Sequence, residues 1–328
     1  MTARRPGRRA VLRTALAAPL MLPFARAALA FPDRPVRLLV GFPPGTGPDL
    51  VARLLADALR EAWPGGMVVE NRPGAAGHIA AQEAARATPD GHTLLFSEIG
   101  QLSMAPSTYA RLPYDPARDF APVARLVTAD FGFVVPAALP AADLDAYVAL
   151  ARQRPQVFMG TFGAGTLGHF GAVMLAQQAG FRQESVHFRA TGEGMTALLN
   201  GDLQGMFGSV ALVAPHVRGG RLKALATTGP ERSALLAQVP TMRELGRPGL
   251  EFEAWFGVSA PAATPASALA TLEGAILRAL ANPANRSRLE EAGFRLAPQD
   301  RTAFGAQIAA DRQRWAEVVR QTGFRAIE

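Results

Sequence analysis

The feature that most constrains this chain is a short apolar run that leads through a loop of glycine and proline into a periodic helix. Val36–Val40 favours a strand, and the segment Gly41–Asp49 is rich in Gly and Pro. Apolar residues then recur at helical spacing over Leu50–Leu59, and Asp49 is predicted as the N-cap of that helix. In such a unit the free backbone N–H groups of the first helical turn point out of the helix N-terminus, where they can bind an anion.

The composition of this first glycine loop limits how it can bind. It contains no Lys, Arg, Ser or His, so any hold on an anion would come from the backbone. Phe42 either covers a ligand or anchors the loop to its own domain, and both interpretations stay open. An ordinary strand-to-helix turn also remains open at this point.

A second unit of the same kind follows about 120 residues later. Val157–Phe162 favours a strand, and a second glycine loop leads to a helix that begins near His169. Strand-like and helical patterns alternate along the chain, which predicts an α/β architecture of two similar domains joined by two or more crossing segments. The other expected elements are strands at Met67–Val69, Thr93–Phe96 and Trp255–Ala260, and helices near Ile79–Ala87, after an N-cap at Asp143, and at Ala266–Leu280, Ala284–Ala292 and Thr302–Arg320.

The first thirty residues have the pattern of an export signal. Arginines at positions 4, 5, 8, 9 and 13 precede an apolar stretch, and Ala28–Ala30 has the small residues of a cleavage site. The pair Arg8-Arg9 resembles a twin-arginine signal, with a general secretion signal as the alternative. The stretch is too short to span a bilayer. The sequence therefore predicts cleavage near Ala30 and a periplasmic mature protein that is not inserted in the membrane.

Charge and cysteine content exclude several classes of function. The chain has 34 basic and 27 acidic residues, a net charge of +7, but six of the arginines lie in the signal segment. The mature chain would therefore be nearly neutral, so nothing in its charge indicates a nucleic acid or an anionic membrane as partner. The chain has no cysteine, which excludes disulfides, thiolate metal sites and a cysteine nucleophile.

The second loop also matches the dinucleotide fingerprint G-x-G-x-x-G over Gly163–Gly168. Glu184 lies at about the sequence distance expected of an acid that binds a ribose. An exported nucleotide-cofactor-dependent enzyme is therefore one alternative. No nucleophile elbow, phosphate-binding lysine or metal-ligand spacing of histidines accompanies it, so no catalytic residue, cofactor or metal is predicted.

His169 is the histidine best placed to contribute to a site. At the start of the helix after the second loop it either lines a cleft or bonds to the backbone, and the two interpretations are equally open. His92 and His187 stand beside strand-like runs and are predicted to be packing residues.

A series of short segments, taken in order, adds a resemblance to these patterns. The first loop is similar to P-F-P-P-G-G-x-x-D. The other matching segments are Glu70–Ala75, Pro89–Leu95, Leu112–Pro116 with Asp119-Phe120, Gly163–His169, Gly220–Ala226, Val239–Thr241 and Trp255–Gly257. Together they resemble the Bug family, the extracytoplasmic solute-binding proteins of tripartite tricarboxylate transporters. Each segment is weak alone, but their order along the mature chain is specific.

The resemblance implies a two-lobed periplasmic-binding-protein fold of type II, the Venus flytrap, in which each lobe is a mixed sheet flanked by helices. Residues 31–130 plus 253–328 would form lobe 1, and residues 131–252 would form lobe 2. The implied function is capture of a small carboxylate-containing solute for the membrane components of such a transporter, by a monomer without enzymatic activity. Sensing for a membrane kinase is a further alternative.

The same resemblance implies that the two loops face each other across a cleft and hold a carboxylate with backbone amides and water. The implied ligand-binding residues are Phe42, Pro43, Pro44, Gly45, Thr46, Gly47, Asp49, Gly163, Ala164, Gly165, Thr166, His169 and Phe188.

Five departures from the family pattern bear on the choice of ligand. Gly41 replaces the usual Pro, and Thr46 replaces the second Gly, adding a hydroxyl that either donates to a ligand or crowds the cleft. Phe188 replaces a Tyr and removes a hydroxyl donor, and Gln204 occupies a site that is often acidic. Glu193, if it faces the cleft, would favour a ligand with a cationic or hydroxyl group. The alternative for Glu193 is a solvated acid at a helix start.

Overall fold

Three short apolar strands near the beginning of the folded chain form a parallel sheet. They are β1 (Val36–Val40), β2 (Met67–Asn71) and β3 (Thr93–Glu98). β1 lies between the other two, with its residues opposite β2 on one side and β3 on the other. All but one residue of each of β1 and β3 is buried, as expected of parallel strands covered on both faces. The helices α1 (Gly47–Ala58) and α2 (His78–Ala85) connect these strands.

The structure is a computed structural model that describes residue 2 and residues 31–328 apart from 64 and 189. The predicted signal segment, its twin-arginine pair and the cleavage site near Ala30 lie outside the described residues. Residues 31–328 group into one unit by their contacts.

The long strand β4 (Phe120–Pro136) takes part in two sheets. Along its first part it pairs with β9 (Glu253–Pro261) and β10 (Arg295–Gln299), which gives the order β2-β1-β3-β9-β4-β10. Beyond Asp130, which pairs with Glu253, it changes partners, and Phe131 pairs with Ser209. β4 is therefore a single strand whose first part belongs to the first sheet and whose last part belongs to the second.

The second sheet begins, like the first, with three parallel strands of which the first in the chain lies in the middle. Its strands are β5 (Val157–Thr161), β6 (Gln183–His187), β7 (Gly205–Ser209) and β8 (Leu222–Thr227), in the order β6-β5-β7-β4-β8. In each sheet three strands are parallel and an antiparallel strand from the other half of the chain is inserted next to them. The predicted α/β class, with mixed sheets flanked by helices, is confirmed.

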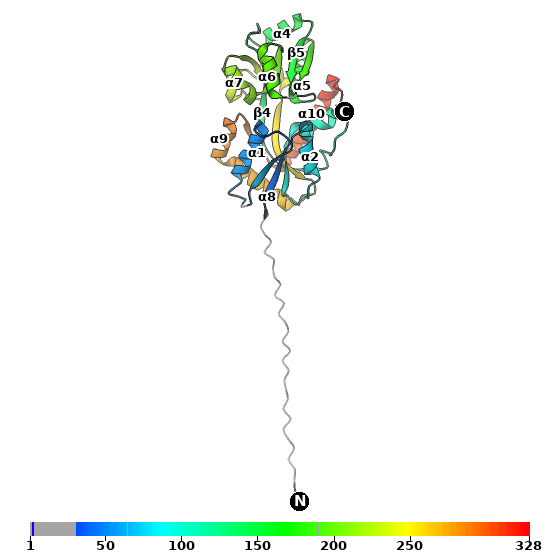
Figure 1. Cartoon of the computed structure of the whole chain (residues 1–328), viewed down its shortest axis with the longest axis vertical. Coiled ribbons are helices and arrows are strands. Elements are labelled where there is room, and N and C mark those ends of the chain that lie inside the picture. The colour runs from blue at the N-terminus through cyan, green and yellow to red at the C-terminus, as the bar shows by residue number, and fades with distance from the viewer. Residues whose placement is uncertain (1, 3–30, 64, 189) are drawn as a thin grey trace. The chain divides into compact units, whose positions relative to one another are not determined.

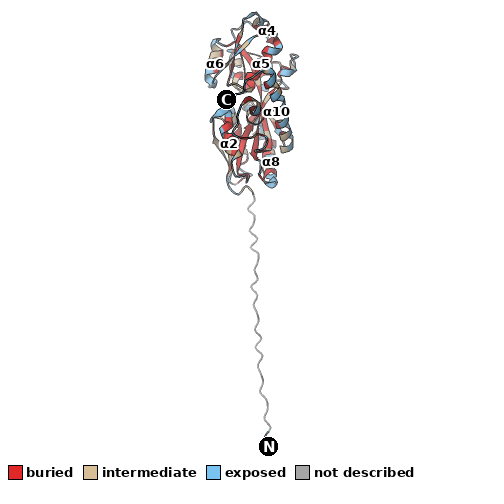
Figure 2. Cartoon of the chain, turned by 90° about the vertical axis from the view of Figure 1, so that its right-hand side faces the viewer, coloured by how far each residue is buried: buried red, intermediate tan, exposed pale blue. Residues whose placement is uncertain are grey.

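Helices cover both sheets. α4 (Leu144–Gln153), α5 (Leu167–Ala179), α6 (Thr191–Asn200) and α7 (Val210–Arg218) lie around one end of β4, and α1, α2 and α8 (Ala266–Ala281) around the other (Figure 1). α9 (Pro283–Glu291) and α10 (Arg301–Thr322) follow, and the short helical segments η1 (Ala75–Gly77), η2 (Gly100–Met104), α3 (Ala105–Thr108), η3 (Ala234–Leu236) and η4 (Pro248–Leu250) lie in connections. Buried residues follow the strands and the inner faces of the helices (Figure 2). Among the described residues, no helix combines the length and apolar character needed to cross a bilayer.

Aromatic side chains from distant parts of the chain pack where the two sheets meet. Phe252, just before β9, lies 5.8 Å from the ring of Phe207 on β7 and 6.2 Å from the ring of Trp315 on α10. Trp315 also lies 5.8 Å from Phe170 on α5. These contacts join α5 and β7 of the second sheet to α10, which packs on the first.

Candidate ligand-binding site

The first glycine loop is held in shape by the buried carboxylate of Asp49. One carboxylate oxygen accepts hydrogen bonds from the backbone N–H of Gly45 and from Arg53 Nε, both at 2.9 Å, and the other accepts from Asn71 Nδ2 at 2.8 Å. Burial favours the neutral acid, but these hydrogen bonds outweigh it and hold the pKa of Asp49 below its usual range. Asp49 therefore acts within the loop as an anionic anchor.

The start of α1 differs from the prediction. Thr46, and not Asp49, occupies the N-cap position, and Asp49 is the third residue of the helix. The Thr46 hydroxyl donates to the carbonyl of Pro43 at 2.7 Å and makes no capping bond. Within the described part of the chain, the first-turn N–H groups of Gly47 and Asp49 are therefore left without a side-chain partner. The predicted N-cap was wrong because the carboxylate is used by Arg53 and the loop.

The remaining predicted residues of this loop lie at its surface. Pro43, Pro44, Gly45 and Gly47 are exposed. Phe42 is partly buried against the main core, and its carbonyl accepts from Asn71 Nδ2 at 3.0 Å. The ring therefore anchors the loop to its own sheet, and a contact of Phe42 with a ligand stays a prediction.

The second glycine loop is held by hydroxyl groups. The carbonyl of Gly163 accepts from the hydroxyls of Thr161 at 2.8 Å and Thr166 at 2.9 Å. Thr166 is the N-cap of α5, where its hydroxyl oxygen accepts from the N–H of His169 at 3.4 Å. Ala164 is half-buried between the two loop glycines. Unlike α1, α5 therefore has a side-chain cap.

His169 is buried and neutral. Its Nδ1 accepts from the N–H of Gly165 at 3.1 Å, so the proton of the neutral ring lies on Nε2. Burial, and then the ring of His187 at 5.0 Å, lowers the pKa of His169 to about 4. The bond to the backbone is thus present, and the Nε2–H remains as a donor for a neighbouring group.

Phe188 lies at the carboxyl end of the second sheet, directly after β6. It is half-buried, and its ring packs over glycine at the start of α6: a Cβ added at Gly194 would lie 3.2 Å from the Phe188 ring and 2.8 Å from the Phe162 ring. The aromatic ring thus fills the space between β5 and α6.

The two loops approach the same segment of the first half, residues 98–109. A Cβ added at Gly41 would lie 2.6 Å from the Cα of Gly77 and 2.8 Å from Gln101 Nε2. A Cβ added at Gly165 would lie 3.2 Å from the Cβ of Thr108, at the end of α3. Both loops therefore lie against the chain that leaves β3, at the carboxyl edge of a parallel sheet, where α/β proteins generally bind ligands.

Glu98, the last residue of β3, lies in this segment and was not among the predicted site residues. Its carboxylate accepts from the backbone N–H groups of Gly100 and Gln101, each at 2.9 Å. Desolvation raises the pKa of Glu98 to about 7. The signal that could have identified it is an acid that follows the apolar run Thr93–Phe96 after a single serine.

Three other residues weighed from the sequence lie away from the loops. Glu184 pairs with Phe158 near the amino ends of β6 and β5. The fingerprint loop follows the carboxyl end of β5, so the expectation that Glu184 contacts a ribose bound at this loop was wrong. Gln204 is also at the amino end, where its amide oxygen accepts from the N–H of Phe158 at 2.8 Å. Glu193 is exposed in the first turn of α6, which favours the solvated helix-start interpretation.

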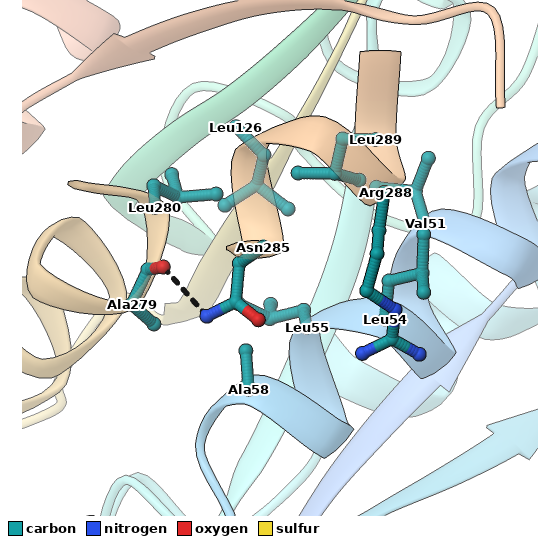
Figure 3. Close-up of a pocket in the computed structure, with 10 residues that line it drawn as sticks. All are labelled: Val51, Leu54, Leu55, Ala58, Leu126, Ala279, Leu280, Asn285, Arg288 and Leu289. Carbon is teal, nitrogen blue, oxygen red and sulfur yellow. Dashed lines mark hydrogen bonds between the residues drawn. The ribbon is translucent and has the colours of Figure 1, made fainter. Parts of the chain in front are cut away.

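Two hollows elsewhere contain no residue of the glycine loops. Leucines from α1, α8 and α9 line a crevice of about 10 Å³, no larger than a water molecule needs, in which Asn285 donates to the carbonyl of Ala279 at 2.9 Å (Figure 3). A polar hollow of about 120 Å³ lies between β4, β9 and α10. Asp311 at its wall accepts from Trp255 and Gln307, each at 2.8 Å. The first is a packing defect, and the second has room for several water molecules.

Comparison with known proteins identifies the family. The profile of the Tripartite tricarboxylate transporter family receptor (TctC) matches residues 51–324. Protein BugT of Bordetella pertussis is 32% identical over 297 residues, covering 89% of this chain and 90% of BugT. The structure of Rpa4515 of R. palustris with adipate is 28% identical with a TM-score of 0.83, covering 90% of this chain and all of that one. MatC of Rhodopseudomonas palustris with bound malate is 30% identical with a TM-score of 0.75, covering 88% of this chain and all of MatC.

These likenesses confirm the predicted periplasmic-binding-protein fold and indicate a periplasmic solute-binding role. The match begins within α1 and ends beyond α10, so it covers the second glycine loop and every strand from β2 to β10, while β1 and the first glycine loop precede it. The chain therefore belongs to the tripartite tricarboxylate transporter receptor family, which includes the Bug proteins.

Proposed function

We propose that this protein captures a small carboxylate between its two glycine loops and delivers it to the membrane components of a tripartite tricarboxylate-type transporter. The observation that carries the proposal is the open N-terminus of α1. Its first-turn N–H groups have no side-chain cap, and the one carboxylate in the loop, that of Asp49, is already bonded to Gly45, Arg53 and Asn71. A helix start left open in this way is suited to an external carboxylate.

The second loop would provide the opposing donors. The Nε2–H of neutral His169 and the free N–H groups at the start of α5 lie beside Gly163–Thr166. Each hydrogen bond to a charged group is worth about 1.5–3 kcal/mol, so a few of them hold a carboxylate without an arginine. The adipate and malate named for the two solved relatives are small carboxylates of this kind.

In this proposal the two sheets correspond to two lobes, residues 31–130 plus 253–328 and residues 131–252. The exchange of partners along β4 at Asp130 and Phe131 supports this division. Closure of the lobes around β4 and β9 would remove water from the ligand and bring the two sets of donors together. Export through a signal within residues 1–30, and a monomeric state, belong to the same proposal.

The proposal predicts that ligand raises the melting temperature of the mature protein. A thermal-shift screen of carboxylates including adipate and malate should find compounds that stabilise it, by about 2.7 kcal/mol at one hundred times the dissociation constant. The hit should bind one molecule per chain in calorimetry and remain chemically unchanged. Turnover of the hit would contradict a purely binding function.

Thr46→Asp tests the part assigned to α1. A carboxylate at the N-cap would occupy the first-turn N–H groups, so the variant should melt at or above the wild-type temperature and lose the shift produced by the hit. Thr46→Asn places an uncharged side chain at the same N-cap, so it should reduce the affinity for the ligand less than Thr46→Asp does. An undiminished shift in Thr46→Asp would show that the carboxylate binds elsewhere.

A further inference from the structure

Glu98 differs from the other acidic group of the site in having no cationic partner. Asp49 is paired with Arg53 at 2.9 Å, whereas no ion pair in the described part of the chain involves Glu98. The two backbone N–H groups that bond to Glu98 use one lone pair on each oxygen and leave the others free. The carboxylate is therefore an acceptor with unused capacity.

The neighbours of Glu98 in the fold contact both glycine loops. Gln101, whose N–H bonds to Glu98, lies against Gly41 of the first loop. Tyr109, whose pKa is raised by burial and by the charge of Glu98, directly follows Thr108, which lies against Gly165 of the second loop. Glu98 is thus bracketed by residues in contact with both loops.

We propose that Glu98 selects a ligand that carries a protonated amine in addition to its carboxylate. This inference rests on the proposed function, because it assumes that the ligand carboxylate lies at the loops. The proposed carboxylate site at the loops is made of hydrogen-bond donors, and Glu98 has no cationic partner among the described residues, so a zwitterion satisfies both ends. A second ligand carboxylate at the same place would face a like charge.

Proton linkage follows from the pKa of Glu98, about 7. An ammonium group favours the ionised form, so its binding should strengthen as pH rises from 6 to 8 and should release protons near pH 7. A second carboxylate would require the neutral acid, so its binding should weaken over the same range and take up protons. Amino-carboxylates and dicarboxylates are therefore expected to show pH dependences of affinity, and proton exchanges on binding, of opposite sign.

The other titratable or charged groups around Glu98 do not change charge in this range. Burial lowers the pKa of His78 to about 4 and raises the pKa values of Tyr109 and Tyr114 beyond the usual range of a tyrosine. His169 on the second loop has a pKa of about 4, and the guanidinium group of Arg312 on α10 donates to the carbonyl of Leu102 in η2. A pH dependence between 6 and 8 thus reports on Glu98.

The test uses pairs of compounds that differ only at one end. The pairs are succinate with β-alanine, glutarate with 4-aminobutyrate, and adipate with 5-aminovalerate, measured by titration calorimetry on the mature protein at pH 6, 7 and 8. At pH 8 the wild type should bind the amino member of the best pair more tightly than the dicarboxylate member. At pH 7, titrations in buffers of different ionisation enthalpy should show that binding of the amino member releases protons. This readout needs no variant.

Glu98→Gln should reduce the affinity for the amino member by about tenfold or more, the effect of losing a charged hydrogen bond, and should abolish its pH dependence. Glu193→Gln is the matched control, because Glu193 is exposed on α6. This variant should leave the affinity for the amino member and its pH dependence unchanged. His169→Gln should lower affinity while keeping the pH dependence.

Preference for the dicarboxylate member, or a Glu98→Gln protein that binds the amino member as the wild type does, would overturn the assignment of Glu98 and leave carboxylate capture intact. Failure of all six compounds to bind folded wild-type protein would contradict both statements.

Discussion

Replacing Gly41 by alanine is expected to destabilise the protein by about 1–3 kcal/mol, the usual cost of forcing extra atoms into a packed site. A Cβ at this position would lie 2.6 Å from the Cα of Gly77 and 3.0 Å from its carbonyl oxygen. Both atoms belong to the backbone, so relief requires the first glycine loop and η1 to separate. The variant should therefore also lose ligand affinity, because the loop moves with Gly41.

Thermal and urea denaturation of the mature variant, with calorimetry of the best ligand, measure the two effects. Gly192→Ala is the matched control. Gly192 lies in the first turn of α6, where an added Cβ meets nothing within 4 Å, so this substitution should stabilise by up to about 1 kcal/mol through helix propensity. A Gly41→Ala protein as stable as the wild type would show that the two glycine backbones are not held at this distance.

Replacing Asp49 by alanine is expected to cost about 2–3 kcal/mol of stability. The change leaves Arg53, the amide of Asn71 and the N–H of Gly45 without their shared acceptor. The value lies below that of a fully buried ion pair because half of the Arg53 side chain is exposed and reaches water. The first loop should lose its shape, so ligand affinity should fall together with stability.

The Asp49 effect also has a defined pH dependence. Because its pKa is lower in the folded protein than the unfolded value of about 3.9, its stabilisation is complete above that pH and is lost as the pH falls through the folded pKa. Denaturation at pH 7, 5 and 3.5 should therefore show a constant difference between wild type and Asp49→Ala at the first two and a smaller one at the third.

Asp145→Ala is the control for Asp49. Asp145 is also an acid in the first turn of a helix, α4, but its side chain is 88% exposed and its contact with Arg247 is 3.4 Å long. Its removal should change stability by less than about 1 kcal/mol. An Asp49→Ala effect no larger than this would contradict the role of Asp49 as the anchor of the loop.

The local pattern of the sequence predicted most of the elements. The strand at Val36–Val40 has the predicted bounds, and the helix predicted at Ala266–Leu280 extends over Ala266–Ala281. Asp143 caps α4 by accepting a hydrogen bond from the N–H of Ala146 at 2.8 Å. These succeed because hydrophobic period and capping act over a few neighbouring residues. The long strand β4 was not predicted as one element, because its pairing depends on strands more than one hundred residues away.

The candidate site was predictable only in part. The glycine loops follow from composition, and both lie at the carboxyl ends of parallel strands, as a strand–loop–helix unit requires. The N-cap of α1 was not predicted correctly, because the Asp49 carboxylate bonds to Arg53 and Asn71 instead of capping the helix. Asn71 lies on β2, so no local pattern indicates this contact. Glu98 was missed because nothing near it in the sequence shows that its carboxylate lacks a cation.

By itself, the sequence determined the α/β class, the two glycine loops and the family, since these depend on local periodicity and on the order of short segments. The tertiary structure decided which groups are free to act. It paired Asp49 with Arg53, left the N-terminus of α1 without a side-chain cap and exposed Glu193 to solvent. It also placed Glu98 next to Gln101, which lies against the first loop. The physical reason is that availability for binding depends on burial and on partners far away along the chain, which no local pattern records.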